Sequence, residues 1–199
     1  MAMKHLEAEA SQSQSPFGIA AMVPLSLIYA FGFLTTTLLP IWVGAMSKAF
    51  NVLPSRLGLI GSAELSAIAL TSIAAAILAP PLDKKRWITV AVLIAGCGNL
   101  ASAFAPTLLV FAGLRVVVGT VVGFLLSDIS RRAAKAPVPP RVFAAQIFVM
   151  VICAVVFFTS APMLLARWGP GAPFAFIAII GLLSLLSLVW LPLVTLIPD

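Results

Sequence analysis

Two opposite charges inside apolar segments are the residues of this sequence best suited to chemistry. Glu64 lies in the apolar run 57–80, and Arg115 lies in the apolar run 107–127. Each charge stands seven or eight residues from the start of its run. At 1.5 Å per residue both would lie about 10–12 Å deep from the same end of a helical bundle, so the spacing allows an ion pair.

Two interpretations of Glu64 and Arg115 follow from their cost in an apolar medium. A charge at the centre of a membrane helix costs about 2.5–3.5 kcal/mol on insertion scales, so neither is expected to face lipid alone. The functional interpretation is a substrate or proton site that faces a central cavity. The structural interpretation is an ion pair that only fixes helix packing. The sequence leaves both open.

Further polar and small residues recur at helical spacing. Tyr29 and Thr36 share one face of the run 17–47 and predict either a hydroxyl stripe for a solute or contacts between helices. Gly119 and Gly123 follow Arg115 and predict close helix packing. Two polar singletons, Asn99 and Gln146, are interpreted as packing hydrogen bonds.

Catalytic groups are missing from the apolar runs. The one histidine, His5, lies in the polar N-terminal segment, and Cys97 and Cys153 are interpreted as small apolar packing residues. No metal-ligand cluster and no glycine-rich phosphate loop are present in the sequence. We therefore expect no enzyme, no metal site and no cofactor.

The composition defines the medium in which these residues must work. Apolar residues make up 62% of the 199 residues, charged residues only 9%, and the mean hydropathy is +1.16. Soluble domains carry about 25% charged residues, so a soluble enzyme, a nucleic-acid binder and a disordered tail are all excluded. The net charge of +6 is better explained by basic loops on one side of a membrane than by nucleic acid.

Six apolar runs are long enough to cross a bilayer as helices. None has the polar face of a soluble helix, and none alternates as a β-barrel strand does. The sequence predicts an all-α membrane protein with a cytoplasmic tail over 1–16 and a six-helix bundle over 17–199. The runs are 17–47, 57–80, 87–104, 107–127, 142–166 and 172–195.

Basic residues between the runs predict the orientation. Eight lie on the side of the two termini and three on the other side, which makes the first side cytoplasmic. We therefore expect both termini in the cytoplasm, with the protein in the plasma (inner) membrane. The smaller group is Lys48, Arg56 and Arg167.

Several motifs resemble the N-terminal six-helix half of a major facilitator superfamily transporter. The connection APPLDKKRW over 79–87 is similar to the family's charged loop between helices two and three. The stretch LRVVVGTVVG over 114–123 resembles its fourth helix, and DISRR over 128–132 closes that helix with an acid and bases. Pro162 and the aromatic residues after it resemble its junction of helices five and six.

This resemblance implies two six-helix halves with the substrate site between them. It implies that the first and fourth helices line the cavity, which would place Tyr29, Thr36 and Arg115 at the site. It also implies a cytoplasmic gate, although the same charges are alternatively interpreted as setting topology only. The gate residues would be Asp83, Lys84, Arg86, Asp128, Arg131 and Arg132.

The predicted function is that of a secondary active transporter half that moves a small solute by alternating access. The alternative is a non-transporting membrane fragment or scaffold that packs against another membrane protein. A channel is disfavoured because no ring of charge or filter-like loop is visible. Expected partners are the lipid bilayer, a small solute with a coupling proton as an option, and a second six-helix half, but no nucleic acid. That half would belong to the same gene, a separate chain or a second copy, and the end of the chain near 199 favours the first.

Overall fold

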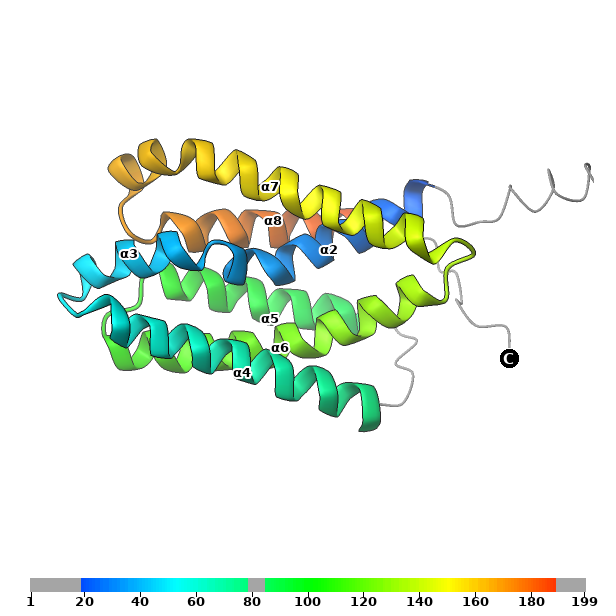
Figure 1. Ribbon diagram of the computed structural model, residues 1–199, viewed down its shortest axis with the longest axis horizontal. Coiled ribbons are helices and arrows are strands. Elements are labelled where there is room, and N and C mark those ends of the chain that lie inside the picture. The colour runs from blue at the N-terminus through cyan, green and yellow to red at the C-terminus, as the bar shows by residue number, and fades with distance from the viewer. Residues whose placement is uncertain (1–18, 79–84, 189–199) are drawn as a thin grey trace, which may run out of the picture.

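Helices make up the described part of the chain, residues 19–78 and 85–188 of the computed structural model (Figure 1). No strand occurs in these residues, so the prediction of an all-α fold is confirmed. The seven helices are α2 Ile19–Thr37, α3 Leu39–Ala49, α4 Pro54–Leu78, α5 Lys85–Ala103, α6 Leu108–Ala134, α7 Pro139–Trp168 and α8 Ala172–Leu188.

The first apolar run folds as two helices, α2 and α3, which meet at an angle of 53°. Pro40 stands at the second position of α3 and has no N–H to continue the hydrogen-bond ladder of α2. In the same last turn of α2, the carbonyl of Thr35 accepts a hydrogen bond of 3.0 Å from the indole Nε1 of Trp42. The bend is therefore a proline break, and the Trp42 side chain pairs with one carbonyl of the turn beside it.

The fourth run extends further than its apolar residues indicate. We predicted a span that ends at 127 and a connection over 128–141, but α6 continues to Ala134 and α7 already begins at Pro139. Proline suits the first turn of a helix because the missing N–H would be unpaired there anyway. The connection shrinks to 135–138, and the charged segment 128–132 is helical.

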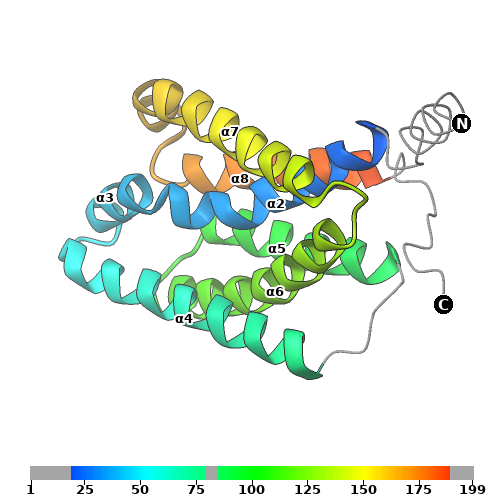
Figure 2. The ribbon, with the colours of Figure 1, turned by 45° about the vertical axis from the view of Figure 1, so that its right-hand side comes forward.

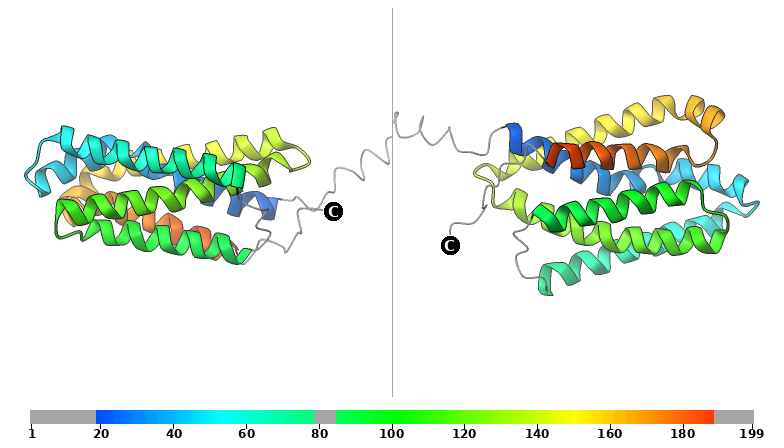
Figure 3. Two further views of the ribbon diagram at one scale, coloured as in Figure 1. Left: turned by 90° about the horizontal axis from the view of Figure 1, so that it is seen from below. Right: turned by 180° about the vertical axis from the view of Figure 1, so that it is seen from behind.

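The packing of the helices follows a repeated pattern. Helix α4 packs on α6 and α7 packs on α2, while α5 and α8 pack on each other and on α6 and α2 respectively. Exchanging the first three spans for the last three leaves this pattern unchanged. The contacts therefore follow the pattern expected of two three-span repeats. Figures 2 and 3 show α2, α4, α6 and α7 on one side of the bundle and α5 and α8 on the other.

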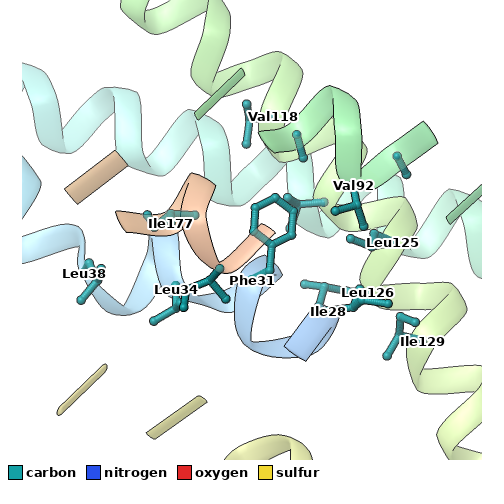
Figure 4. Close-up of a cluster of buried hydrophobic side chains, with 14 of the residues drawn as sticks. Ile28, Phe31, Leu34, Leu38, Val92, Val118, Leu125, Leu126, Ile129 and Ile177 are labelled. Atoms are coloured by element: carbon teal, nitrogen blue, oxygen red, sulfur yellow. The ribbon is translucent and has the colours of Figure 1, made fainter. Parts of the chain in front are cut away.

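The core lies where α2, α5, α6 and α8 meet (Figure 4). Phe31 is fully buried there, and an added Cβ at Gly181 of α8 would lie 2.7 Å from its ring. A second close approach joins α4 and α6. An added Cβ at Gly119 would lie 2.6 Å from the carbonyl oxygen of Glu64, and one at Gly123 would overlap the carbonyl of Ile68. Small residues thus let these backbones approach, which is how membrane helices gain packing energy.

Two ends of the bundle matter for the site. The Asp128 end is where α2, α5 and α7 begin, and it carries Asp128 near the end of α6. The Lys48 end is where α3 and α7 end and α4, α6 and α8 begin, and it carries Lys48 in the last turn of α3. Figure 1 shows the two ends at the right and the left of the bundle.

Candidate functional site

Arg115 of α6 forms a buried polar cluster with two neighbouring helices. Its side chain is fully buried, and Nη1 donates to Oε1 of Glu64 on α4 over 3.2 Å. Nη2 donates to Oδ1 of Asn99 over 3.1 Å and to Oγ of Ser102 over 2.8 Å, both on α5. One guanidinium therefore ties three helices together. We call these four residues the Arg115 cluster.

Aromatic rings cover the guanidinium. The Phe174 ring of α8 has its centroid 4.8 Å from Cζ of Arg115, and the Phe111 centroid lies at 5.9 Å. Trp42 contacts both rings, with centroid separations of 5.7 and 5.8 Å. A desolvated cation over an aromatic face gains about 2 kcal/mol, so α3 and α8 contribute to the same cluster.

Local features of the sequence hold the cluster in place. Gly119 lies one turn after Arg115 and brings the α4 backbone close to α6 at Glu64. Asn99 and Ser102 are three residues apart, so they share a face of α5. Each also donates to its own helix, Asn99 Nδ2 to the Ala95 carbonyl over 2.9 Å and Ser102 Oγ to the Gly98 carbonyl over 2.7 Å. These bonds orient the oxygens toward Arg115.

The Arg115 cluster is electrically balanced and closed to solvent. Glu64 is 3% exposed and Arg115 is 0% exposed, so a bound solute does not reach either charge in this conformation. Of the guanidinium nitrogens only Nε has no partner among the described residues. The geometry brings Glu64 and Arg115 together, as their similar depth allowed, and it adds Asn99 and Ser102. The sequence analysis did not identify Ser102. Its position three residues after Asn99, on the same helix face, was the pattern that could have indicated it.

The hydroxyl stripe of α2 is separate from this cluster. Thr36 donates to the Phe33 carbonyl of its own helix over 2.8 Å, and the Tyr29 ring stacks against Phe33 at 4.7 Å. Within the described residues, neither side chain forms a hydrogen bond or ring contact with the Arg115 cluster, and both are half-buried. The sequence predicts that Gln146 of α7 forms a packing hydrogen bond, and this prediction is wrong for the described conformation. It is fully buried, and neither end of its amide has a partner among the described residues.

A second group of charges lies at the Asp128 end. Oδ2 of Asp128 accepts from Nε of Arg132 over 2.8 Å, and Oδ1 accepts from Nη2 of Arg131 over 3.3 Å. All three residues lie on α6, three and four positions apart. The predicted gate residues Asp83 and Lys84 lie outside the described residues. Arg86 lies in the first turn of α5 and is exposed.

Cavities open between several of the described helices, and two of them bear on the argument. A groove of about 420 Å³ between α5 and α8 has a carbon lining that includes Gly96 and Cys97. A second cavity of about 640 Å³, which we call the α3–α7 wedge, lies at the Lys48 end and is lined by both apolar residues and Lys48. In the described part of the chain no group of three potential metal ligands exists.

The sequence matches no protein-family profile and no curated protein sequence. Among solved structures, the fold is similar to that of the proton:xylose symporter XylE of the major facilitator superfamily, solved with bound 6-bromo-6-deoxy-D-glucose. The TM-score is 0.68 at 18% sequence identity, and the match covers 85% of this chain. This chain spans only 44% of that symporter's length.

The chain therefore shares its fold with the part of that symporter that it covers. Its helices also fit a bilayer. Within the described residues, α4, α6 and α7 and residues 86–103 of α5 are long and apolar enough to cross a membrane, and α2 with α3 forms one more, bent span. The described part of α8 is apolar but has only 17 residues. The protein is an integral membrane protein.

Proposed function

We propose that this chain is the N-terminal half of a secondary active transporter that moves a small solute across the membrane by alternating access. The observation that carries the proposal is the match of the helical bundle to one half of a proton:sugar symporter. In that mechanism two bundles rock around a site held between them. The second half would be the rest of the same gene product, a separate chain or a second copy.

The face formed by α2, α4, α6 and α7 would meet the second half. Only 17% of the most apolar stretch of α4 and 22% of that of α7 are buried, so these two helices form open edges of the bundle. Tyr29 and Thr36 lie on α2, which contacts α6, α7 and α8. We propose that they contact the solute, alongside groups from the missing half.

For Glu64 and Arg115 we propose a role in coupling rather than direct contact with the solute. The buried pair holds α4 against α6, and both helices belong to the proposed interface. Protonation of Glu64 would leave Arg115 without its counter-charge in a site that water does not reach, so the two helices would have to rearrange. The structural alternative, a permanent clasp, predicts that transport keeps its pH dependence in the Glu64→Gln variant.

The Asp128 end would be the cytoplasmic end. This orientation places the larger group of basic residues inside, with Arg86, Arg131 and Arg132 at that surface. We propose that these residues, with Asp83, Lys84 and Asp128, form the cytoplasmic gate. The test is cysteine labelling of Lys85→Cys in a chain without Cys97 and Cys153. Labelling from outside intact cells would refute the orientation.

The decisive experiment for transport uses purified protein in liposomes. We expect no solute uptake by a verified monomer, because one bundle supplies only one wall of the site. Uptake of radiolabelled sugars and organic acids is measured for the chain alone and for the chain assembled with a second half. Mass photometry reports the assembly state. Absence of uptake in every assembly would favour the scaffold alternative, and uptake by a monomer would overturn the two-bundle mechanism.

A further inference from the structure

The α3–α7 wedge arises from the bend in the first span. Helix α2 packs along α7, but the 53° turn at residue 38 directs α3 toward α4. The first span therefore lies against α7 along α2 and diverges from α7 along α3. The space between α3 and the end of α7 measures about 640 Å³, which lies within the range of about 300–1,000 Å³ typical of small-molecule sites.

The lining of the wedge combines apolar groups with a single charge. Its apolar part comes from Ile41 and Ala45 of α3 and from Leu165 and Pro170 at the end of α7. Lys48 is the one charged lining residue. Gly44 of α3 also lines it, and an added Cβ at Gly44 would meet nothing within 4 Å. The wedge is therefore open at its middle and cationic at one side.

Charge at the Lys48 end has one sign throughout the described residues. The cations there are Lys48, Arg56 in the first turn of α4, and Arg167 in the last turn of α7. The only acids in the described part of the chain are Glu64 and Asp128, and each is already held in an ion pair. No described carboxylate competes for Lys48. A cleft lined by one sign of charge concentrates ions of the opposite sign.

We propose that the α3–α7 wedge binds a small amphipathic organic anion, with the carboxylate on the ammonium of Lys48 and the apolar part among the α3 and α7 side chains. The inference rests on the proposed transport function, because it names the class of solute received at the outer mouth of the path. An ammonium suits this role as a compact point charge on a flexible stem. The apolar lining excludes fully polar sugars from the same position.

Binding is tested separately from transport. The chain is placed in nanodiscs of zwitterionic lipid, and binding of radiolabelled octanoate is measured by equilibrium dialysis against empty nanodiscs. Octanol and octylammonium are the neutral and cationic probes of equal length. We expect saturable binding of octanoate only. Equal binding of all three probes, or no saturable octanoate binding, would overturn the proposal.

Matched variants locate the site. Lys48→Gln should weaken octanoate binding about tenfold, because it removes a charge-assisted hydrogen bond, while Lys48→Arg should retain most of it. Arg56→Gln removes a cation from the same end but not from the lining, so it should leave binding unchanged. An equal effect of Arg56→Gln would reduce Lys48 to a contributor to the general field and would refute the site.

A second pair of variants tests the cavity itself. Gly44→Leu adds a side chain whose Cβ meets nothing within 4 Å, so it should occupy the wedge and abolish octanoate binding. Gly58→Leu on α4 also enters open space but lies outside the lining, so it should bind like the parent chain. Circular dichroism confirms that both fold. Octanoate binding without uptake in any assembly would support the wedge as a binding site and refute the transport function. Uptake that Gly44→Leu leaves unchanged would refute the wedge as the place where the solute enters.

Discussion

Helix α6 takes part in two groups of ion pairs that differ in their partners and their exposure. Near the Lys48 end, Arg115 reaches across 51 residues of sequence to Glu64, and both side chains are enclosed. Near the other end, Asp128 pairs with Arg131 and Arg132 of its own helix, whose side chains are 31% and 13% exposed. The first pair joins separate helices, whereas the second stabilises one helix end. The same chemistry thus serves tertiary packing in one place and local structure in the other.

The largest expected effect on stability comes from breaking the ion pair between Glu64 and Arg115. Glu64→Leu leaves Arg115 charged and enclosed, which should lower the free energy of unfolding by about 3–5 kcal/mol. The measurement is unfolding in mixed micelles of a mild detergent and dodecyl sulfate, followed by circular dichroism. Ser62→Leu, at an exposed position on the same helix, is the control and should stay within about 0.5 kcal/mol of the parent chain.

The double variant Glu64→Leu/Arg115→Met sharpens this result. Replacing a buried pair by apolar residues of similar volume is often neutral, so the second change should restore most of the lost stability. If the double variant is as unstable as Glu64→Leu, the loss came from packing at Glu64 and not from a stranded charge.

Stability should depend next most strongly on the close approach of α4 and α6. An alanine Cβ at Gly123 would overlap the Ile68 carbonyl, so Gly123→Ala should force α4 from α6 and cost about 1–3 kcal/mol. Gly113 lies on the same helix with open space around it. Gly113→Ala should be neutral or stabilising by up to about 1 kcal/mol. Equal responses at the two glycines would show that α4 does not depend on close approach.

A smaller effect is expected from the local pair. Asp128→Asn removes the charge but keeps an oxygen for the two arginines, which lie at a helix end and reach solvent. The loss in unfolding free energy should be about 0.3–1 kcal/mol by the same measurement. A loss as large as that of Glu64→Leu would mean that Asp128 also holds another element, and the contrast between the two pairs would fail.

The smallest expected effect is a difference in how the two groups of ion pairs respond to salt. Raising the ionic strength from about 0.1 to 1 M shortens the Debye length from about 10 to 3 Å, which weakens interactions near solvent but hardly those in an enclosed site. The stability difference between Asp128→Asn and the parent chain should shrink, while that for Glu64→Leu should persist. Parallel salt dependence in the two variants would contradict the enclosed position of Arg115.

Short-range patterns predicted part of this molecule well. Apolar runs located the helices because a spanning segment must satisfy its backbone internally and face lipid with carbon. They misplaced the end of α6, since the helix outlasts the apolar run when Asp128 and its arginines stabilise the final turns. Pro40 explains the break between α2 and α3, whereas the contacts of Trp42 with Phe111 and Phe174 join helices that are far apart in the sequence.

The sequence by itself determined the medium, the number of apolar runs and the spacing that pairs Asp128 with its neighbours, because these depend on composition and on the period of one helix. Only the tertiary structure decided that Arg115 meets Asn99 and Ser102 as well as Glu64, and that a wedge opens beside Lys48. Both outcomes depend on which faces of separate helices meet. That choice is made by glycines at the crossings and by the bend near residue 38, and no periodicity within a single run records it.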